Sequence, residues 1–189
     1  MEPGWEDNWR AFHRPVEIGR LWVEPPWEEA PEGLLPVVID PGGAFGTGAH
    51  PTTRLCLELL QELEPASLLD VGCGSGVLAI AAARLGFAPI MALDNDPEAI
   101  EATLTNAAAN GVSLDARLAD ALAASLPPAE VVVCNISLQA LEKLVPGLEC
   151  KTLVVSGFLA SEHPVLMGFE VVERREQQEW AALLAYAVA

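Results

Sequence analysis

The sequence predicts a doubly wound α/β fold, in which helices cover both faces of a mostly parallel β-sheet. Short apolar runs alternate with segments of helical periodicity along most of the chain. Most of these runs are continuously apolar, which is typical of strands that are buried on both faces. Strands that alternate with helices of this length are joined by right-handed crossover connections, and these place the helices on the two faces of the sheet.

The individual elements follow from this alternation. Strands are expected at residues 35–40, 67–72, 89–96, 114–120, 129–136, 151–158, 169–176 and 180–189. Helices are expected at residues 51–63, 76–86, 97–111 and 138–148. Asp96 followed by Pro97 is a typical helix start, and Gly86 and Gly111 fit the exit position after a helix. The last two strands are separated by a few polar residues, which favours an antiparallel hairpin at one edge of the sheet.

Residues 1–36 differ in composition from the rest of the chain. They hold four of the five tryptophans, Trp5, Trp9, Trp22 and Trp27, and a proline-rich stretch. We interpret this segment as an extended arm or linker, whose tryptophans anchor it to the core. The remaining residues, 37–189, form one domain, because a chain of 189 residues with 51% apolar residues is long enough for one good core.

Several features of the chain point to a cytoplasmic protein. No apolar stretch is long enough to span a membrane, and the first ten residues lack the basic and apolar regions of a signal peptide. Cys56, Cys73, Cys134 and Cys150 occur singly and not at the spacing of metal ligands. We therefore expect free thiols and no metal site.

The charge of the chain is strongly negative. It has 27 acidic and 10 basic residues, for a net charge of −17. Such a surface repels a phosphate backbone, so direct binding of nucleic acid is not expected. The charge is consistent either with solubility alone or with attraction of a basic protein partner.

Residues 70–76, with the sequence DVGCGSG, form a glycine-rich turn between a predicted strand and a predicted helix. Ligands of doubly wound sheets bind at such turns, and Gly72, Gly74 and Gly76 suit both tight geometry and close approach of a ligand. The spacing differs from the dinucleotide-binding pattern, whose last glycine follows the second by three positions. Asp70 ahead of the turn disfavours a pyrophosphate and suits a cationic ligand such as S-adenosyl-L-methionine.

Two further acidic residues complete a site of this kind. Asp94 ends the next strand, 24 residues after Asp70. A carboxylate there can accept hydrogen bonds from both ribose hydroxyls of the cofactor, and we include the adjacent Asn95 in the site. Asp120 ends the third strand of the set, where it can accept from the adenine amine or cap a helix.

Two longer segments carry a resemblance to a known family. Residues 39–60, IDPGGAFGTGAHPTTRLCLELL, and residues 132–141, VVCNISLQAL, resemble the ribosomal protein L11 methyltransferases of the PrmA type. These are class I S-adenosylmethionine-dependent enzymes, so the resemblance implies a Rossmann-like, seven-stranded sheet with an antiparallel final hairpin.

The resemblance also implies roles for individual residues. The positions that match Thr53, Gly72, Asp94 and Asn135 bind the cofactor, and the loop with Phe45, Gly46 and Thr47 closes over it. The groups that the family methylates are amines of lysines and of the N-terminus of the ribosomal protein.

The residues themselves agree with this assignment. Thr53 lies in the first turn of a predicted helix, whose free N–H groups can hold a carboxylate. Asn135 is the candidate catalytic residue, because its carbonyl can accept from an incoming amine, although it cannot act as a base. Ile136 and Ser137 follow Asn135, in contrast to the sequence of enzymes that methylate planar amides, which favours an aliphatic amine. His50 is either a helix cap, a packed loop residue or a catalytic group.

Alternative functions remain open at this stage. The resemblance begins about where the linker after the separate N-terminal recognition domain of the PrmA type would lie, and that domain is either cut from this sequence or naturally absent. In both cases we expect the chain by itself to bind the cofactor normally but to methylate the ribosomal protein poorly. It can instead modify lysines of another protein, such as an electron-transfer flavoprotein subunit. A non-catalytic cofactor-binding module and an NAD-dependent oxidoreductase are the alternatives from other classes, and the glycine spacing argues against the oxidoreductase.

Overall fold

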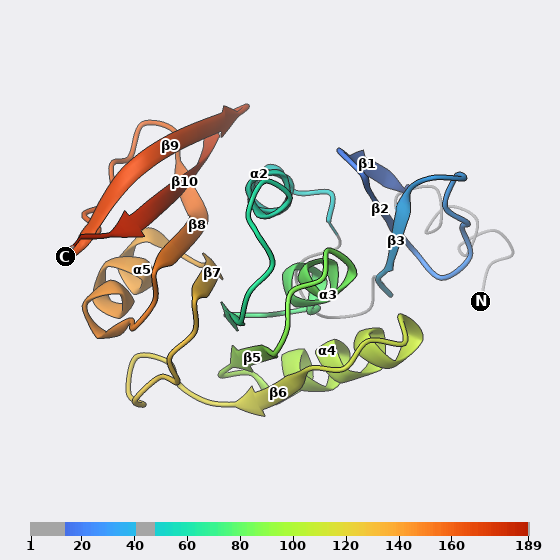
Figure 1. Cartoon of the computed structure of the whole chain (residues 1–189), viewed down its shortest axis with the longest axis horizontal. Coiled ribbons are helices and arrows are strands. Elements are labelled where there is room, and N and C mark those ends of the chain that lie inside the picture. The colour runs from blue at the N-terminus through green and yellow to red at the C-terminus, as the bar shows by residue number, and fades with distance from the viewer. Residues whose placement is uncertain (1–13, 41–47, 189) are drawn as a thin grey trace, which may run out of the picture.

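The computed structural model describes residues 14–40 and 48–188, and its centre is a seven-stranded sheet (Figure 1). The strand order is β6-β5-β4-β7-β8-β10-β9, with five parallel strands followed by two antiparallel ones. The strands are β4 (Leu68–Val71), β5 (Ile90–Asp94), β6 (Asp115–Leu118), β7 (Val131–Asn135), β8 (Thr152–Leu159), β9 (Phe169–Gln177) and β10 (Trp180–Ala187). This order confirms the doubly wound sheet and its antiparallel C-terminal hairpin.

Helices cover both faces of this sheet. The helices are α2 (Pro51–Leu60), α3 (Val77–Arg84), α4 (Pro97–Ala109) and α5 (Leu138–Leu144), which continues into the short 3₁₀ helix η1 (Val145–Gly147). The first three pack on one face and α5 on the other, so the core forms two layers. Strand β7 shows the alternation, because Val131 and Val133 face the first layer whereas Val132 and Cys134 face the second.

The helix ends use the residues that the sequence indicates. The Asp96 side chain accepts from the backbone N–H of Glu98 at the start of α4, with Pro97 in the first helical position. Gly86 and Gly111 follow α3 and α4 with φ values of 98° and 62°. This left-handed conformation explains why glycine ends both helices. Within the described residues, no helix is long and apolar enough to cross a membrane.

A second, smaller sheet precedes the large one. It consists of β1 (Val16–Ile18), β2 (Leu21–Glu24) and β3 (Leu35–Val38), in that order. The strand predicted at residues 35–40 therefore pairs with the N-terminal segment. The described part of the predicted arm is not simply extended, because β1 and β2 form a hairpin around Gly19, whose φ is 56°. The small sheet spans the predicted boundary at residue 36, and the division into arm and domain stays a prediction.

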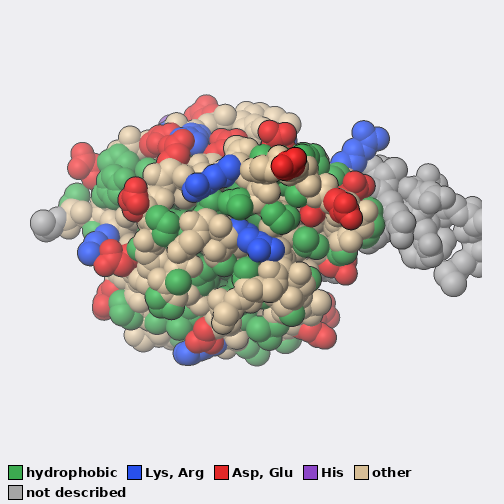
Figure 2. All heavy atoms as spheres, turned by 45° about the vertical axis from the view of Figure 1, so that its right-hand side comes forward, with side chains coloured by type: hydrophobic (Ala, Val, Ile, Leu, Met, Phe, Trp, Pro, Cys, Tyr) green, Lys and Arg blue, Asp and Glu red, His purple; other side chains and the backbone are tan. Residues whose placement is uncertain are grey.

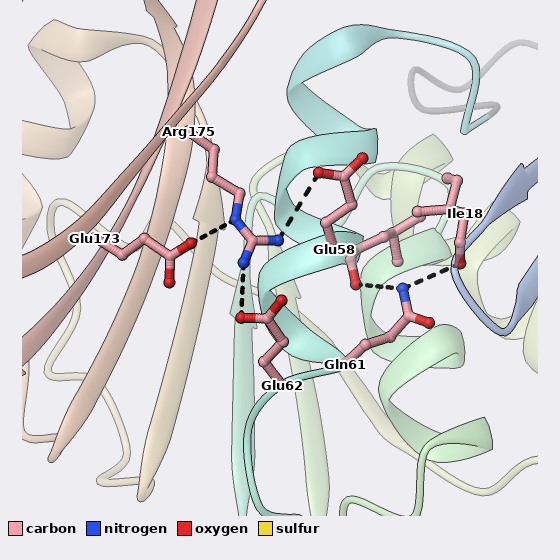
Figure 3. Close-up of polar contacts among 7 residues, drawn as sticks. Ile18, Glu58, Gln61, Glu62, Glu173 and Arg175 are labelled. Carbon is pink, nitrogen blue, oxygen red and sulfur yellow. Dashed lines mark hydrogen bonds and ion pairs between the residues drawn. The ribbon is translucent and has the colours of Figure 1, made fainter.

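Helix α2 joins this small sheet to the C-terminal hairpin (Figure 3). Gln61 at its end donates to the carbonyl of Ile18 at 3.0 Å and accepts from the N–H of Arg20 at 2.8 Å. On the other side, Arg175 of β9 forms ion pairs at 2.6 Å with Glu173 and with Glu62, the second residue after α2, and Glu58 of α2 lies 3.8 Å away. These polar contacts fix α2 from both sides.

Candidate functional site

The glycine-rich turn between β4 and α3 is shaped by protein neighbours as well as by its backbone. Gly72, Gly74 and Gly76 have φ values of 76°, 54° and 81°, a region that other residues rarely adopt. A Cβ on Gly72 would lie 2.5 Å from the side chain of Ile136, and one on Gly76 would lie 3.0 Å from Thr103. The glycines are thus required by the fold whether or not a ligand approaches them.

Asp70 lies beneath this turn and is fully buried. Its Oδ2 accepts from the backbone N–H of Ala79 at 3.2 Å, in the first turn of α3, whereas Oδ1 has no hydrogen-bond partner in the described part of the chain. Burial raises the pKa of the carboxyl from 3.8 to about 7; the Ala79 bond counteracts this shift, and the charge of Asp94 adds to it. Asp70 therefore combines a structural contact with one unsatisfied oxygen.

Asp94 at the end of β5 is held in place by two backbone donors. Its Oδ2 accepts from the N–H of Gly74 at 2.9 Å, and its Oδ1 accepts from the N–H of Asp96 at 3.0 Å. Each carboxylate oxygen has two acceptor positions, so both oxygens keep one for a ligand. The turn and the next strand thereby orient one carboxylate at the carboxyl edge of the sheet.

A pocket of about 460 Å³, counting the space open to solvent, lies next to Asp94. Four predicted site residues line it, namely Gly72, Asp94, Asn95 and Asp120. The rest of its wall is apolar and consists of Val71, Leu93, Ala119, Ala121, Leu122, Ile136, Ala140 and Leu144. Polar groups on one side and aliphatic side chains around them are typical of a site for a nucleoside. Asp120 is exposed there, and its Oδ1 accepts from the N–H of Leu122 at 2.9 Å.

Asn135 and Thr53 meet beside this pocket. Asn135 ends β7, and its Nδ2 donates to Oγ1 of the buried Thr53 at 3.3 Å. Because the amide nitrogen is used in this way, the carbonyl oxygen of Asn135 is the atom left to accept from a ligand. The next residue, Ile136, lines the pocket and connects the two parts of the site.

His50 caps α2 on the same side of the sheet. Its Nδ1 lies 2.8 Å from Oγ1 of Thr52 and accepts from the backbone N–H of Thr52 at 3.4 Å. The imidazole ring packs edge-on against Trp180, with 4.9 Å between the ring centroids. The structure therefore confirms the helix-cap role that we weighed for His50, and it adds a packing role.

The Cys73 thiol in the turn is not activated as a nucleophile. Cys73 is buried, and burial together with the charge of Asp70 raises its pKa to about 12. A neutral thiol is a poor nucleophile. The four cysteines are free, as the sequence indicates.

The structure brings most of the predicted site residues to one edge of the sheet. Gly72, Asp94, Asn95 and Asp120 share the pocket, Gly74 is bonded to Asp94, and Thr53 is bonded to Asn135. Asp70 and Gly76 do not line the pocket and support it from behind. The predictions for Phe45, Gly46 and Thr47 lie outside the described residues.

Sequence reasoning missed two side chains near the site, Ile136 and Trp180. The place of Ile136 could have been predicted from the sequence, because a residue directly after the strand-ending Asn135 lies at the same edge of the sheet. The place of Trp180 could not have been predicted, because only the pairing of β10 with β8 brings this residue to the same edge.

The chain is similar to known proteins in both sequence and fold. The family model described as ribosomal protein L11 methyltransferase (PrmA) matches residues 1–187. The chain belongs to the PrmA family. It is 42% identical to the ribosomal protein L11 methyltransferase of Symbiobacterium thermophilum over 97% of its length, and 48% identical to that of Azotobacter vinelandii over 84%.

A PrmA relative of known structure has the same fold as this chain, and the two curated relatives are longer than it. A crystal structure of a ribosomal protein L11 methylase from Lactobacillus delbrueckii superposes with a TM-score of 0.83 at 27% identity, over 93% of this chain and 99% of that one. In contrast, the chain spans only 66% and 58% of the lengths of the two curated PrmA relatives. The family is therefore established for the region that the chain covers.

Proposed function

We propose that the chain transfers methyl groups from S-adenosyl-L-methionine to amine nitrogens of a ribosomal protein, on lysine side chains or at the N-terminus. The names of its relatives point to ribosomal protein L11 as this substrate. The observation that carries this proposal is the pocket beside Asp94, next to the Asn135–Thr53 pair. The pocket suits a nucleoside, and the amide suits an incoming amine.

The residues present fit this cofactor. The two free acceptor positions of Asp94 suit a pair of ribose hydroxyls, and the aliphatic wall with Leu122 and Ile136 suits an adenine ring. Asp70 is fully buried and does not line the pocket, so it supports the turn from behind through its bond to Ala79. Phosphate groups would meet the carboxylates of Asp94 and Asp120 here, so these residues disfavour a dinucleotide and the oxidoreductase alternative.

For methyl transfer, the protein mainly has to position the acceptor amine against the cofactor. The cofactor supplies an activated methyl group, and the acceptor must be a neutral amine held about 3 Å from it in line with the leaving sulfur. Asn135 accepts a hydrogen bond from the amine, and Thr53 fixes the orientation of the Asn135 amide. No described residue has to take the proton, which the amine loses to water before it reacts.

The charge of the chain agrees with a basic protein substrate. Figure 2 shows acidic side chains spread over one face of the molecule, with isolated Lys and Arg residues between them. At a net charge of −17, this surface attracts a lysine-rich protein at long range and speeds its encounter.

The cofactor assignment is tested with Asp94→Ala and binding of S-adenosylhomocysteine. Loss of the charge-assisted bonds to the ribose should weaken binding by about 2–3 kcal/mol in calorimetry. Asp96→Ala is the matched control, because this nearby aspartate only caps α4. It should lower stability by about 1 kcal/mol and leave affinity unchanged. Equal affinities of all three proteins would contradict the assignment.

The acceptor assignment is tested separately. Asn135→Ala should reduce turnover much more than affinity for the cofactor, because the lost bond aligns the amine in the transition state. The acceptor itself can be identified by mass spectrometry of a cell extract incubated with the chain and labelled S-adenosylmethionine. Label on a protein other than the ribosomal one would favour another lysine-modifying role, and no label at all would favour a binding module without catalysis.

A further inference from the structure

One face of α4 carries a polar stripe where an apolar one is expected. Thr103, Asn106 and Asn110 are 0%, 2% and 5% exposed, and their spacing places them on the side of the helix that faces the protein. Buried polar side chains are costly unless their hydrogen bonds are satisfied. The partners of this stripe therefore indicate what it does.

The first two residues of the stripe hold the glycine-rich turn. Thr103 Oγ1 donates to the carbonyl of Gly74 at 3.0 Å, and Asn106 Nδ2 donates to the carbonyl of Ser75 at 2.9 Å. The N–H of Gly74 in turn donates to Asp94. Residues of α4 thus hold the two peptide groups that directly follow the one whose N–H orients the Asp94 carboxylate.

The stripe also holds the end of the small sheet. Asn106 Oδ1 accepts from the N–H of Asp40 at 3.0 Å, so one amide joins the turn to the chain after β3. Asn110 forms two bonds with Val38, from the Val38 N–H at 2.9 Å and to its carbonyl at 2.6 Å, and its remaining bond goes to the Asn106 carbonyl and not to the turn.

We propose that Asn106 and Thr103 are positioning residues for cofactor binding, which set the turn at Gly74 and Ser75 so that Asp94 faces the pocket. Asn110 only attaches β3 to α4. This inference rests on the proposed use of S-adenosyl-L-methionine at the pocket. It predicts that two asparagines of the same helix, equally buried and bonded to the same segment, differ in their effect on affinity.

The test compares Asn106→Leu and Asn110→Leu with the wild-type chain. Both variants should lose stability in urea, because each detaches the end of β3. Only Asn106→Leu should weaken binding of S-adenosylhomocysteine, by about tenfold in calorimetry under conditions where every variant is folded. Thr103→Val, which replaces the hydroxyl by a methyl group, should weaken binding in the same direction by a smaller factor.

The outcomes separate this inference from the proposed function. If the wild-type chain fails to bind S-adenosylhomocysteine, the proposed function is wrong. If the wild-type chain binds but Asn106→Leu and Asn110→Leu bind equally well, the cofactor assignment stands and the positioning role is wrong. If Asn106→Leu does not fold, Thr103→Val decides the question, and unchanged affinity in that variant overturns the proposal.

Discussion

The two halves of the large sheet build the candidate site in different ways. On the side of β4, β5 and β6, the decisive contacts join residues close in sequence, such as Gly74 to Asp94, 20 residues apart, and Thr103 to Gly74, 29 residues apart. On the side of β7, β8 and β10, they join distant segments, and Asn135 meets Thr53 across 82 residues. The contacts around Asp94 are therefore locally encoded, whereas the Asn135–Thr53 pair depends on the assembly of distant segments.

This difference implies that the surroundings of Asn135 are more sensitive than those of Asp94 to changes in packing between segments. The contact of β8 with the segment after β7 is the tightest example. Gly157 has a φ of 100° at an irregularity in the pairing of β8 with β10, and a Cβ there would lie 2.0 Å from the carbonyl oxygen of Ile136.

The largest expected effect tests this sensitivity directly. Gly157→Ala should destabilise the fold by about 4 kcal/mol, because a backbone clash adds to the cost of the left-handed conformation. Gly33→Ala is the matched control, because Gly33 has a φ of 92° and nothing within 4 Å of a new Cβ. It should cost about 1–2 kcal/mol in urea unfolding. Similar losses in both variants would mean that the close approach of β8 to Ile136 is unimportant.

The second prediction concerns the pocket side and the buried Asp70. Its folded-state pKa of about 7 lies above the ordinary 3.8, so the folded state favours the neutral acid. The associated stability is present below about pH 4 and is lost as the pH rises through 7. Asp70→Asn cannot ionise and should gain up to about 4 kcal/mol relative to wild type over this range.

Urea unfolding of both proteins at several pH values measures this gain. A difference in the free energy of unfolding that stays constant from pH 4 to 8 would contradict a neutral Asp70.

The smallest effect concerns the ion pairs that attach the hairpin to α2. Arg175→Met should cost about 1–2 kcal/mol, because it leaves the carboxylates of Glu58, Glu62 and Glu173 close together without a cation. The loss should shrink at high salt. Arg117→Met is the control, because its pair with Asp115 is exposed and contributes little. If Arg175→Met were as mild as the control, packing alone would hold α2 to β9.

The comparison also explains what the sequence can and cannot predict. The glycine turn, Asp94, Asp96 and the exits at Gly86 and Gly111 follow from local rules of turns and caps, so their roles in the fold are readable without coordinates. Trp180 beside His50 is not predictable in this way, because it depends on the register of β10 against β8.

The small sheet was missed for a different reason. Its strands β1 and β2 are short and alternate with charged residues, so the proline-rich composition of their surroundings dominated the interpretation. A signal was present in the two-residue hairpin at Gly19 and Arg20, between alternating apolar residues. The polar stripe on α4 left no such signal in the sequence. Thr103 and Asn106 are indistinguishable from solvent-facing residues until their partners are known.

The strand order has a consequence for folding. In the sequence β8-β10-β9 across the sheet, β10 lies between two strands that precede it in the chain. Strand β9 is attached to the sheet only through β10, its partner in the C-terminal hairpin, and β8 keeps an unpaired edge until β10 docks on it. The hairpin can form by itself, so its docking on β8 is expected to be the later step, and an intermediate with an undocked hairpin is prone to aggregate through the open edge of β8.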